Sequence, residues 1–92
     1  MSNIKVIHFD SGNIDGVSLM QRLNSLCASL YRFDNNSVVV KYLGGAKDLY
    51  EALGDFIQGK NIFIIDVYTD NDSYWGFMNR ELWSWLKENR DE

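Results

Sequence analysis

Apolar and polar residues follow two different periods along this chain. Short runs rich in β-branched residues predict strands, and they lie at residues 4–9, 37–43 and 61–68. Segments with apolar residues three or four positions apart predict amphipathic helices, and they lie at residues 18–31, 46–58 and 74–89. The order predicts an α/β domain with β-α-β-α-β-α connectivity, in which three helices pack a small three-stranded sheet.

The first predicted helix has the clearest local signals. Ser18 and Gln21 have the spacing of a capping box at the start of a helix. Four leucines follow at intervals of four, three and four residues, namely Leu19, Leu23, Leu26 and Leu30. At 100° per residue they share one narrow face, so we expect a single helix over 18–31.

The direction of the strands admits two arrangements. Strands separated by whole helices are usually parallel and joined by right-handed crossovers. An antiparallel pairing of residues 4–9 with 37–43 is the alternative, and it would make the domain α+β. The parallel arrangement would bring the end of the first strand and the end of the third to one edge of the sheet.

Length and charge narrow the class of protein. With 92 residues the chain predicts one domain over 1–92. Thirteen acidic residues against nine basic ones give a formal net charge of −4. This balance argues against a protein that grips nucleic acid directly through a basic face.

Cysteine content and hydropathy point to a compartment. Cys27 is the only cysteine, so the chain cannot form an internal disulfide, and a reducing, cytoplasmic location is expected. No apolar run approaches the ~20 residues of a membrane span, and the first residues do not resemble a signal peptide. We therefore expect no membrane association.

Acidic residues near the strand ends suggest one chemical site. In a parallel sheet, four of them would meet at one edge and could bind Mg²⁺ through carboxylate oxygens: Asp10, Asp66, Asp70 and Asp72. The alternative is that these acids occupy turns and helix caps, which Asp favours. His8 and Cys27 fit structural positions better than catalytic ones, and no catalytic motif appears, so we expect neither an enzyme nor a cofactor.

A stripe of acids on the second predicted helix suggests a binding surface. Asp48, Glu51 and Asp55 fall within an arc of about 60° on the face away from the apolar residues. Together with Asp66, Asp70 and Asp72 they predict an acidic surface that attracts proteins built to bind DNA. A solvated helix face is the alternative.

Aromatic residues are concentrated in the last third of the chain. Trp75 and Trp85 fit one face of the predicted helix over 74–89, whereas Phe77 and Trp83 do not share that face. Phe77 and Trp83 therefore predict an interface with a partner or with a second copy in a homodimer. A core that wraps around the helix is the alternative.

The length, the acidity and the lack of catalytic motifs resemble a class of small phage proteins that disarm host defences. This class includes the anti-restriction proteins of the T-even phage Arn family. The resemblance covers the whole chain but includes no aligned motif, so it transfers no residue role. It implies a non-enzymatic DNA mimic that occupies the DNA-binding surface of a host DNA-binding protein or restriction nuclease. The alternatives are an Asp-based Mg²⁺ site in a small α/β domain, and a dimerisation module.

Overall fold

A computed structural model describes residues 3–67 and 80–89. The elements of this part of the chain are β1 (Ile4–Phe9), α1 (Gly16–Leu26), β2 (Ser29–Asp34), β3 (Ser37–Lys41), α2 (Ala46–Leu53), the 3-10 helix η1 (Gly54–Ile57), β4 (Ile62–Val67) and α3 (Arg80–Asn89). Helices thus combine with a sheet as predicted, in an α+β arrangement. The structure does not describe residues 74–79 of the last predicted helix.

The sheet has four antiparallel strands in the order β2-β3-β1-β4, so the predictions of three strands and of parallel pairing are wrong. The antiparallel alternative for the first two predicted strands is confirmed, since Ile7 pairs with Val38. Helix α1 joins β1 to β2, and α2 joins β3 to β4. In neither case are the two joined strands neighbours in the sheet, because β3 lies between β1 and β2, and β1 lies between β3 and β4. This connectivity is of the split β-α-β, or ferredoxin-like, type.

The additional strand replaces the end of the first predicted helix. Helix α1 ends at Leu26, and Cys27 is extended, with φ of −108° and ψ of 148°. Leu30 satisfies the helical spacing of the leucines, but it also alternates with Tyr31 in β2. The hairpin pairing of Leu30 with Val40 prevails over the local helical pattern, because tertiary contacts override weak local propensity.

The second predicted helix also ends early. Helix α2 ends at Leu53, where Gly54 adopts φ of 60° and begins η1. A positive φ of this kind is open to glycine without strain, so the chain changes direction there. Phe56 and Ile57 still pack towards the core, from η1 rather than from a continuous helix.

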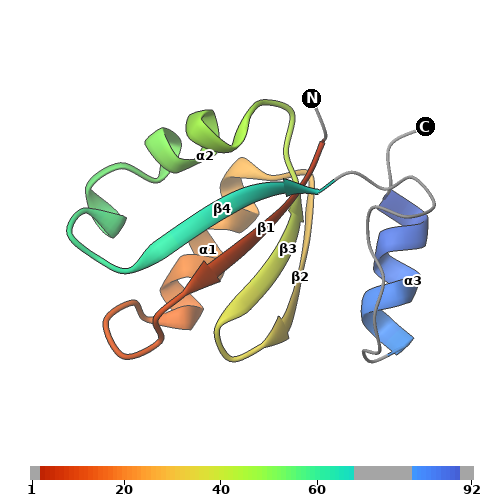
Figure 1. Cartoon of the computed structure of the whole chain (residues 1–92), viewed down its shortest axis with the longest axis horizontal. Coiled ribbons are helices and arrows are strands. Elements are labelled where there is room, and N and C mark those ends of the chain that lie inside the picture. The colour runs from red at the N-terminus through yellow and green to blue at the C-terminus, as the bar shows by residue number, and fades with distance from the viewer. Residues whose placement is uncertain (1–2, 68–79, 90–92) are drawn as a thin grey trace.

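Both faces of the sheet carry apolar side chains, and each face has its own helical layer. Helices α1 and α2 lie on one side of the sheet and α3 on the other (Figure 1). The larger core includes Ile7, Phe9 and Leu49 on the side of α1 and α2. The smaller core joins Ile4 and Val39 to Leu82 and Leu86 of α3. Among the described residues, no helix has the length and apolar character needed to cross a bilayer.

One ion pair is enclosed within this framework. Lys5 of β1 is completely buried, and its ammonium nitrogen lies 3.1 Å from Oδ1 of Asp66 in β4. The two residues are direct partners in the register of β1 and β4. They lie on the face that carries Ile7 and Ile64, so both charges point towards the side of α1 and α2. Burial of a lysine without a carboxylate partner would be costly, so Asp66 has a structural role.

We expect the substitution Asp66→Ala to lower the free energy of unfolding by about 3 kcal/mol, because it leaves the Lys5 ammonium buried without this partner. This value is at the low end of the range expected when a buried ion pair is broken, because the Asp66 side chain is 27% exposed. Urea unfolding followed by circular dichroism measures the change. The double variant Lys5→Met/Asp66→Leu, which removes both charges, is the control and should recover most of the loss. A loss below about 1 kcal/mol in Asp66→Ala would contradict the role assigned to the pair.

Candidate functional site

Most acids of the described loops and caps are engaged by the backbone next to them. The carboxylate of Asp10 accepts a hydrogen bond from Gly12 N at 2.8 Å, and that of Asp34 accepts one from Asn36 N at 2.8 Å. Asp15 caps α1 by accepting from Ser18 N at 3.2 Å and from Ser18 Oγ at 2.7 Å. These hydrogen bonds to Ser18 hold the pKa of Asp15 below its usual value. Such acids stabilise local backbone, as the turn-and-cap alternative predicts.

Asp48 belongs to the same group. Its Oδ2 accepts a hydrogen bond from Gly45 N at 3.1 Å and so closes the first turn of α2. This position also places a negative charge at the positive end of the helix dipole. Asp48 therefore has a local structural role at the start of the helix, whereas its place in the predicted stripe stays a prediction.

Glu51 and Asp55 remain on the outer side of α2 and η1, and both are exposed. Within the described part of the chain, neither side chain accepts a hydrogen bond or forms an ion pair. Both line a shallow hollow of about 270 Å³ together with Tyr50, which is 45% exposed. We call Tyr50, Glu51 and Asp55 the acidic ridge. Although the helix ends between the two acids, the turn at Gly54 keeps them around one depression.

Two basic side chains interact with Phe56 of η1. The guanidinium carbon of Arg22 lies 4.5 Å from the centre of the Phe56 ring, and Lys60 Nζ lies 5.1 Å from it. Both cations therefore interact with the ring of Phe56. Among the described residues, neither Glu51 nor Asp55 forms an ion pair.

The magnesium-site hypothesis fails on the direction of the strands. Asp10 follows the last residue of β1, whereas Asp66 pairs with Lys5, which lies near the first residue of β1. Antiparallel pairing thus places Asp10 and Asp66 at opposite ends of the sheet. Among residues 3–67 and 80–89, no group of three or more potential ligands could hold a metal ion. Asp70 and Asp72, predicted both for this site and for the acidic surface, lie outside the described residues.

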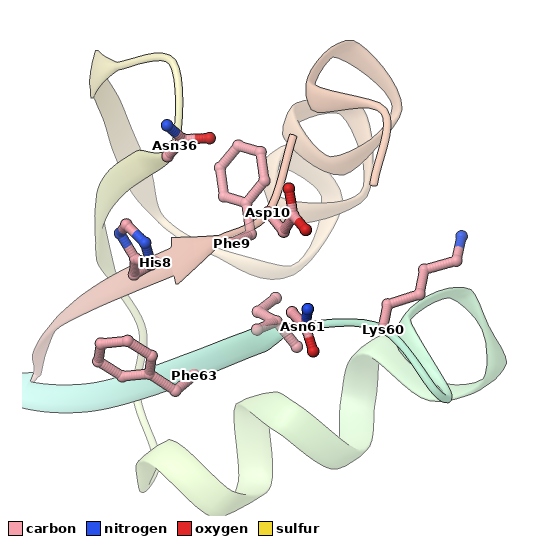
Figure 2. A pocket seen from close by; sticks show the side chains of 8 residues that line it. His8, Phe9, Asp10, Asn36, Lys60, Asn61 and Phe63 are labelled. Atoms are coloured by element: carbon pink, nitrogen blue, oxygen red, sulfur yellow. The ribbon is translucent and has the colours of Figure 1, made fainter. Parts of the chain in front are cut away.

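A larger hollow of about 500 Å³ lies where β1 ends and β4 begins, and the sequence did not indicate it. Figure 2 shows its lining, which comprises His8, Phe9, Asp10, Asn36, Lys60, Asn61, Ile62 and Phe63. Several of its polar groups are already engaged by neighbours. The side-chain oxygen of Asn36 accepts a hydrogen bond from Ser11 N at 3.2 Å, and Asp10 N donates to the Asn61 carbonyl at 2.9 Å. These contacts connect the end of β1 to the residues just before β3 and just before β4.

His8 contributes a ring surface to this hollow. Its Nδ1 lies 3.2 Å from Ser37 Oγ, and its ring centre lies 5.5 Å from that of Phe63. Ser37 is only 7% exposed, so its hydroxyl is poorly placed to attack a substrate. The serine instead orients the imidazole. Figure 2 shows the His8 and Phe63 side chains projecting from the neighbouring strands β1 and β4.

The predicted interface aromatics separate into two groups. Trp83 is half-buried and packs against the smaller core, as the wrap-around alternative predicts. Its neighbour Trp85 donates a hydrogen bond from Nε1 to Ser29 Oγ at 3.0 Å, which helps hold α3 against β2. Phe77 lies outside the described residues.

Cys27 lies beside the larger core, between α1 and β2. Burial raises the pKa of its thiol to about 11, from a usual value of 9.0, because the thiolate would lose solvation there. A catalytic cysteine needs a lowered pKa instead. The environment of Cys27 is thus that of a packing residue.

A scan against protein-family models, a search of curated proteins and a search of solved structures each found no match to this chain.

We expect Cys27 to react with iodoacetamide about 100-fold more slowly in the folded protein than in urea-unfolded protein at pH 8. The two-unit difference between a pKa of about 11 and 9.0 lowers the thiolate fraction by this factor. Mass spectrometry of quenched samples measures both rates. Because the small thiolate fraction of Cys27 limits the reaction in the folded protein, the rate of alkylation should rise with pH up to about 11. Equal rates in the folded and unfolded protein would contradict the assignment.

Proposed function

We propose that this protein is a non-enzymatic acidic interaction protein whose acidic ridge binds the DNA-binding surface of a basic protein. On this proposal it is a DNA mimic of the phage anti-restriction kind, and it inhibits a host DNA-binding protein or restriction nuclease by occupying the site that DNA would use. The observation that carries the proposal is that Glu51 and Asp55 line one exposed hollow, where their side chains have no hydrogen-bond or ion-pair partner among the described residues.

The contrast with the other acids supports this assignment. The carboxylates of Asp10, Asp15, Asp34 and Asp48 accept hydrogen bonds from nearby backbone, and Asp66 is paired with Lys5. Their presence is explained by the stability of turns, helix starts and the core. Glu51 and Asp55 have no comparable structural role among the described residues, so a role towards a partner is the better explanation of their charge.

The placement of the acidic ridge also suits a basic partner. Glu51 near the end of α2 and Asp55 in η1 line the same hollow, so both carboxylates lie on one side of the molecule. A groove lined with Lys and Arg, as in proteins that bind DNA phosphates, can therefore meet both carboxylates at once. Tyr50 adds an exposed aromatic ring of the type enriched in protein interfaces.

This function places the protein in the cytoplasm, in the same compartment as its partner. A single free cysteine suits a reducing environment. If the protein is encoded by a phage, the compartment is the cytoplasm of the host. The proposal requires no cofactor and no direct contact with nucleic acid.

We expect the double variant Glu51→Lys/Asp55→Lys to lose at least tenfold in affinity for basic partners, because two attractive contacts become repulsive. The tagged protein is used to capture DNA-binding proteins from nuclease-treated bacterial lysate, and elution from about 50 mM to 1 M salt ranks their affinity. Competition with duplex DNA for each captured protein then tests occupation of its DNA site. This variant leaves Asp48 unchanged, so the start of α2 keeps its cap.

The matched control is Glu81→Lys/Glu88→Lys on α3. It changes the net charge by the same amount. A lysine at position 81 is unfavourable at the start of α3 and a lysine at position 88 is favourable at its end, so the two effects on the helix oppose each other. Capture should persist in this control, because the acidic ridge is intact. Equal capture by the wild type and by Glu51→Lys/Asp55→Lys would refute the proposed function.

A further inference from the structure

The two edges of the sheet differ in how they are protected. At one edge, β2 has an irregular register between Arg32 and Asp34, and α3 packs against it. Bulges and covering helices of this kind prevent a sheet edge from pairing with another strand. At the other edge, β4 pairs with β1 through six consecutive residues without a register shift. Strand β4 therefore offers a regular edge without a bulge.

The backbone of β4 presents free hydrogen-bonding groups at this edge. Asp10 N donates to the Asn61 carbonyl, which sets the alternation of the ladder between β1 and β4. By this alternation Phe63 and Ile65 direct their backbone groups to β1, whereas three other residues direct theirs outwards: Ile62, Ile64 and Asp66. Among the described residues, none bonds to these outward groups. The edge can therefore accept a further strand.

The side chains of the same strand are unusually apolar for an edge. Phe63 is 54% exposed and Ile65 is 50% exposed, and both lie on the face opposite α1 and α2. Proline and lysine, which commonly protect edges, are absent from β4. The only charged residue of the strand is Asp66, whose charge is balanced by Lys5. A charged partner strand would gain no ion pair here, whereas an uncharged apolar strand would be complementary.

We propose that β4 pairs with β4 of a second copy of this chain and joins the two sheets into one antiparallel sheet of eight strands. An antiparallel pair with its two-fold axis at Ile64 uses the outward backbone groups of all three residues on each copy. Ile64 then lies opposite itself, and Ile62 lies opposite Asp66 of the second copy. Interfaces with two-fold symmetry are self-complementary in this way.

This register also covers the exposed side chains. Phe63 of each copy lies opposite Ile65 of the other, at a position where facing side chains are closest. The four side chains supply on the order of 400 Å² of apolar surface. This is about one third of a small specific interface of roughly 1,200 Å². We therefore expect a reversible dimer with a dissociation constant in the micromolar range, on the order of 1–100 µM.

Sedimentation equilibrium of the purified full chain between about 1 and 500 µM tests the association. We expect a monomer–dimer equilibrium in the wild type and a loss of at least tenfold in association for Phe63→Lys/Ile65→Lys. The control Leu43→Lys makes the same kind of change at a side chain that is 80% exposed outside β4, and it should dimerise like the wild type. Circular dichroism shows whether each variant is folded.

Cross-linking tests the register even where a lysine variant fails to fold. Phe63→Cys and Ile65→Cys are prepared separately, each combined with Cys27→Ala, and then mixed under mild oxidation. Opposite positions with Cα atoms about 4.5 Å apart can form a disulfide, so the mixture should form a covalent heterodimer. In the proposed register two copies of Ile65→Cys would be about 8 Å apart, which is too far. Ile65→Cys alone should therefore cross-link poorly.

Three results would overturn the inference. The first is that the protein stays monomeric at every concentration, even if its β4 edge binds an unrelated extended peptide. The second is a dimer that persists in a folded Phe63→Lys/Ile65→Lys variant. The third is preferential cross-linking of Ile65→Cys with itself, which would require another register. The test is separate from that of the proposed function, because Glu51→Lys/Asp55→Lys should leave the monomer–dimer equilibrium detectable.

Discussion

The antiparallel pairing of β1 with both β3 and β4 organises both cores of the fold. This strand contributes Ile7 and Phe9 to the core under α1 and α2, and Ile4 to the core under α3. The same pairing brings Lys5 beside Asp66, so a charged pair forms on the face of the sheet that carries the larger core. Breaking this register would expose both cores and separate the buried charges at once. The fold thus tolerates a buried lysine because the neighbouring strand supplies its carboxylate.

The strand order also distributes the acidic side chains. It sends Asp10 and Asp66 to opposite ends of the sheet, and so separates two of the acids that a parallel sheet would have gathered. Backbone amides engage Asp15 at the start of α1 and Asp48 at the start of α2. In the proposed function, Glu51 and Asp55 attract the partner, because they line one hollow and make no hydrogen bond or ion pair through their side chains among the described residues. Net charge alone is a poor guide to a binding surface, because many carboxylates also stabilise caps and turns.

The two proposed surfaces are supported by different physical terms. The acidic ridge on α2 and η1 depends on long-range, salt-sensitive attraction. The edge at β4 depends on backbone hydrogen bonds and on burial of Phe63 and Ile65, which salt does not screen. Because α2 contacts β4 within one copy, a dimer through β4 would carry two acidic ridges on one assembly. Two such surfaces on one particle would raise the effective concentration of charge near a symmetric partner.

Local periodicity is enough to locate β1 and the core of α2, and to show that helices and strands share the chain. The apolar spacing of Leu49 and Leu53 is an example, because it can be recognised from neighbouring residues alone. The strand at residues 29–34 depends instead on long-range pairing, because Leu30 satisfies a helical and a strand pattern equally well until β3 offers a partner. Long-range pairing likewise decides the direction of every strand, and hence which acids meet. The pairing of Lys5 with Asp66 and the contact of His8 with Ser37 and Phe63 join residues between 29 and 61 positions apart, and no spacing within either segment carries that information.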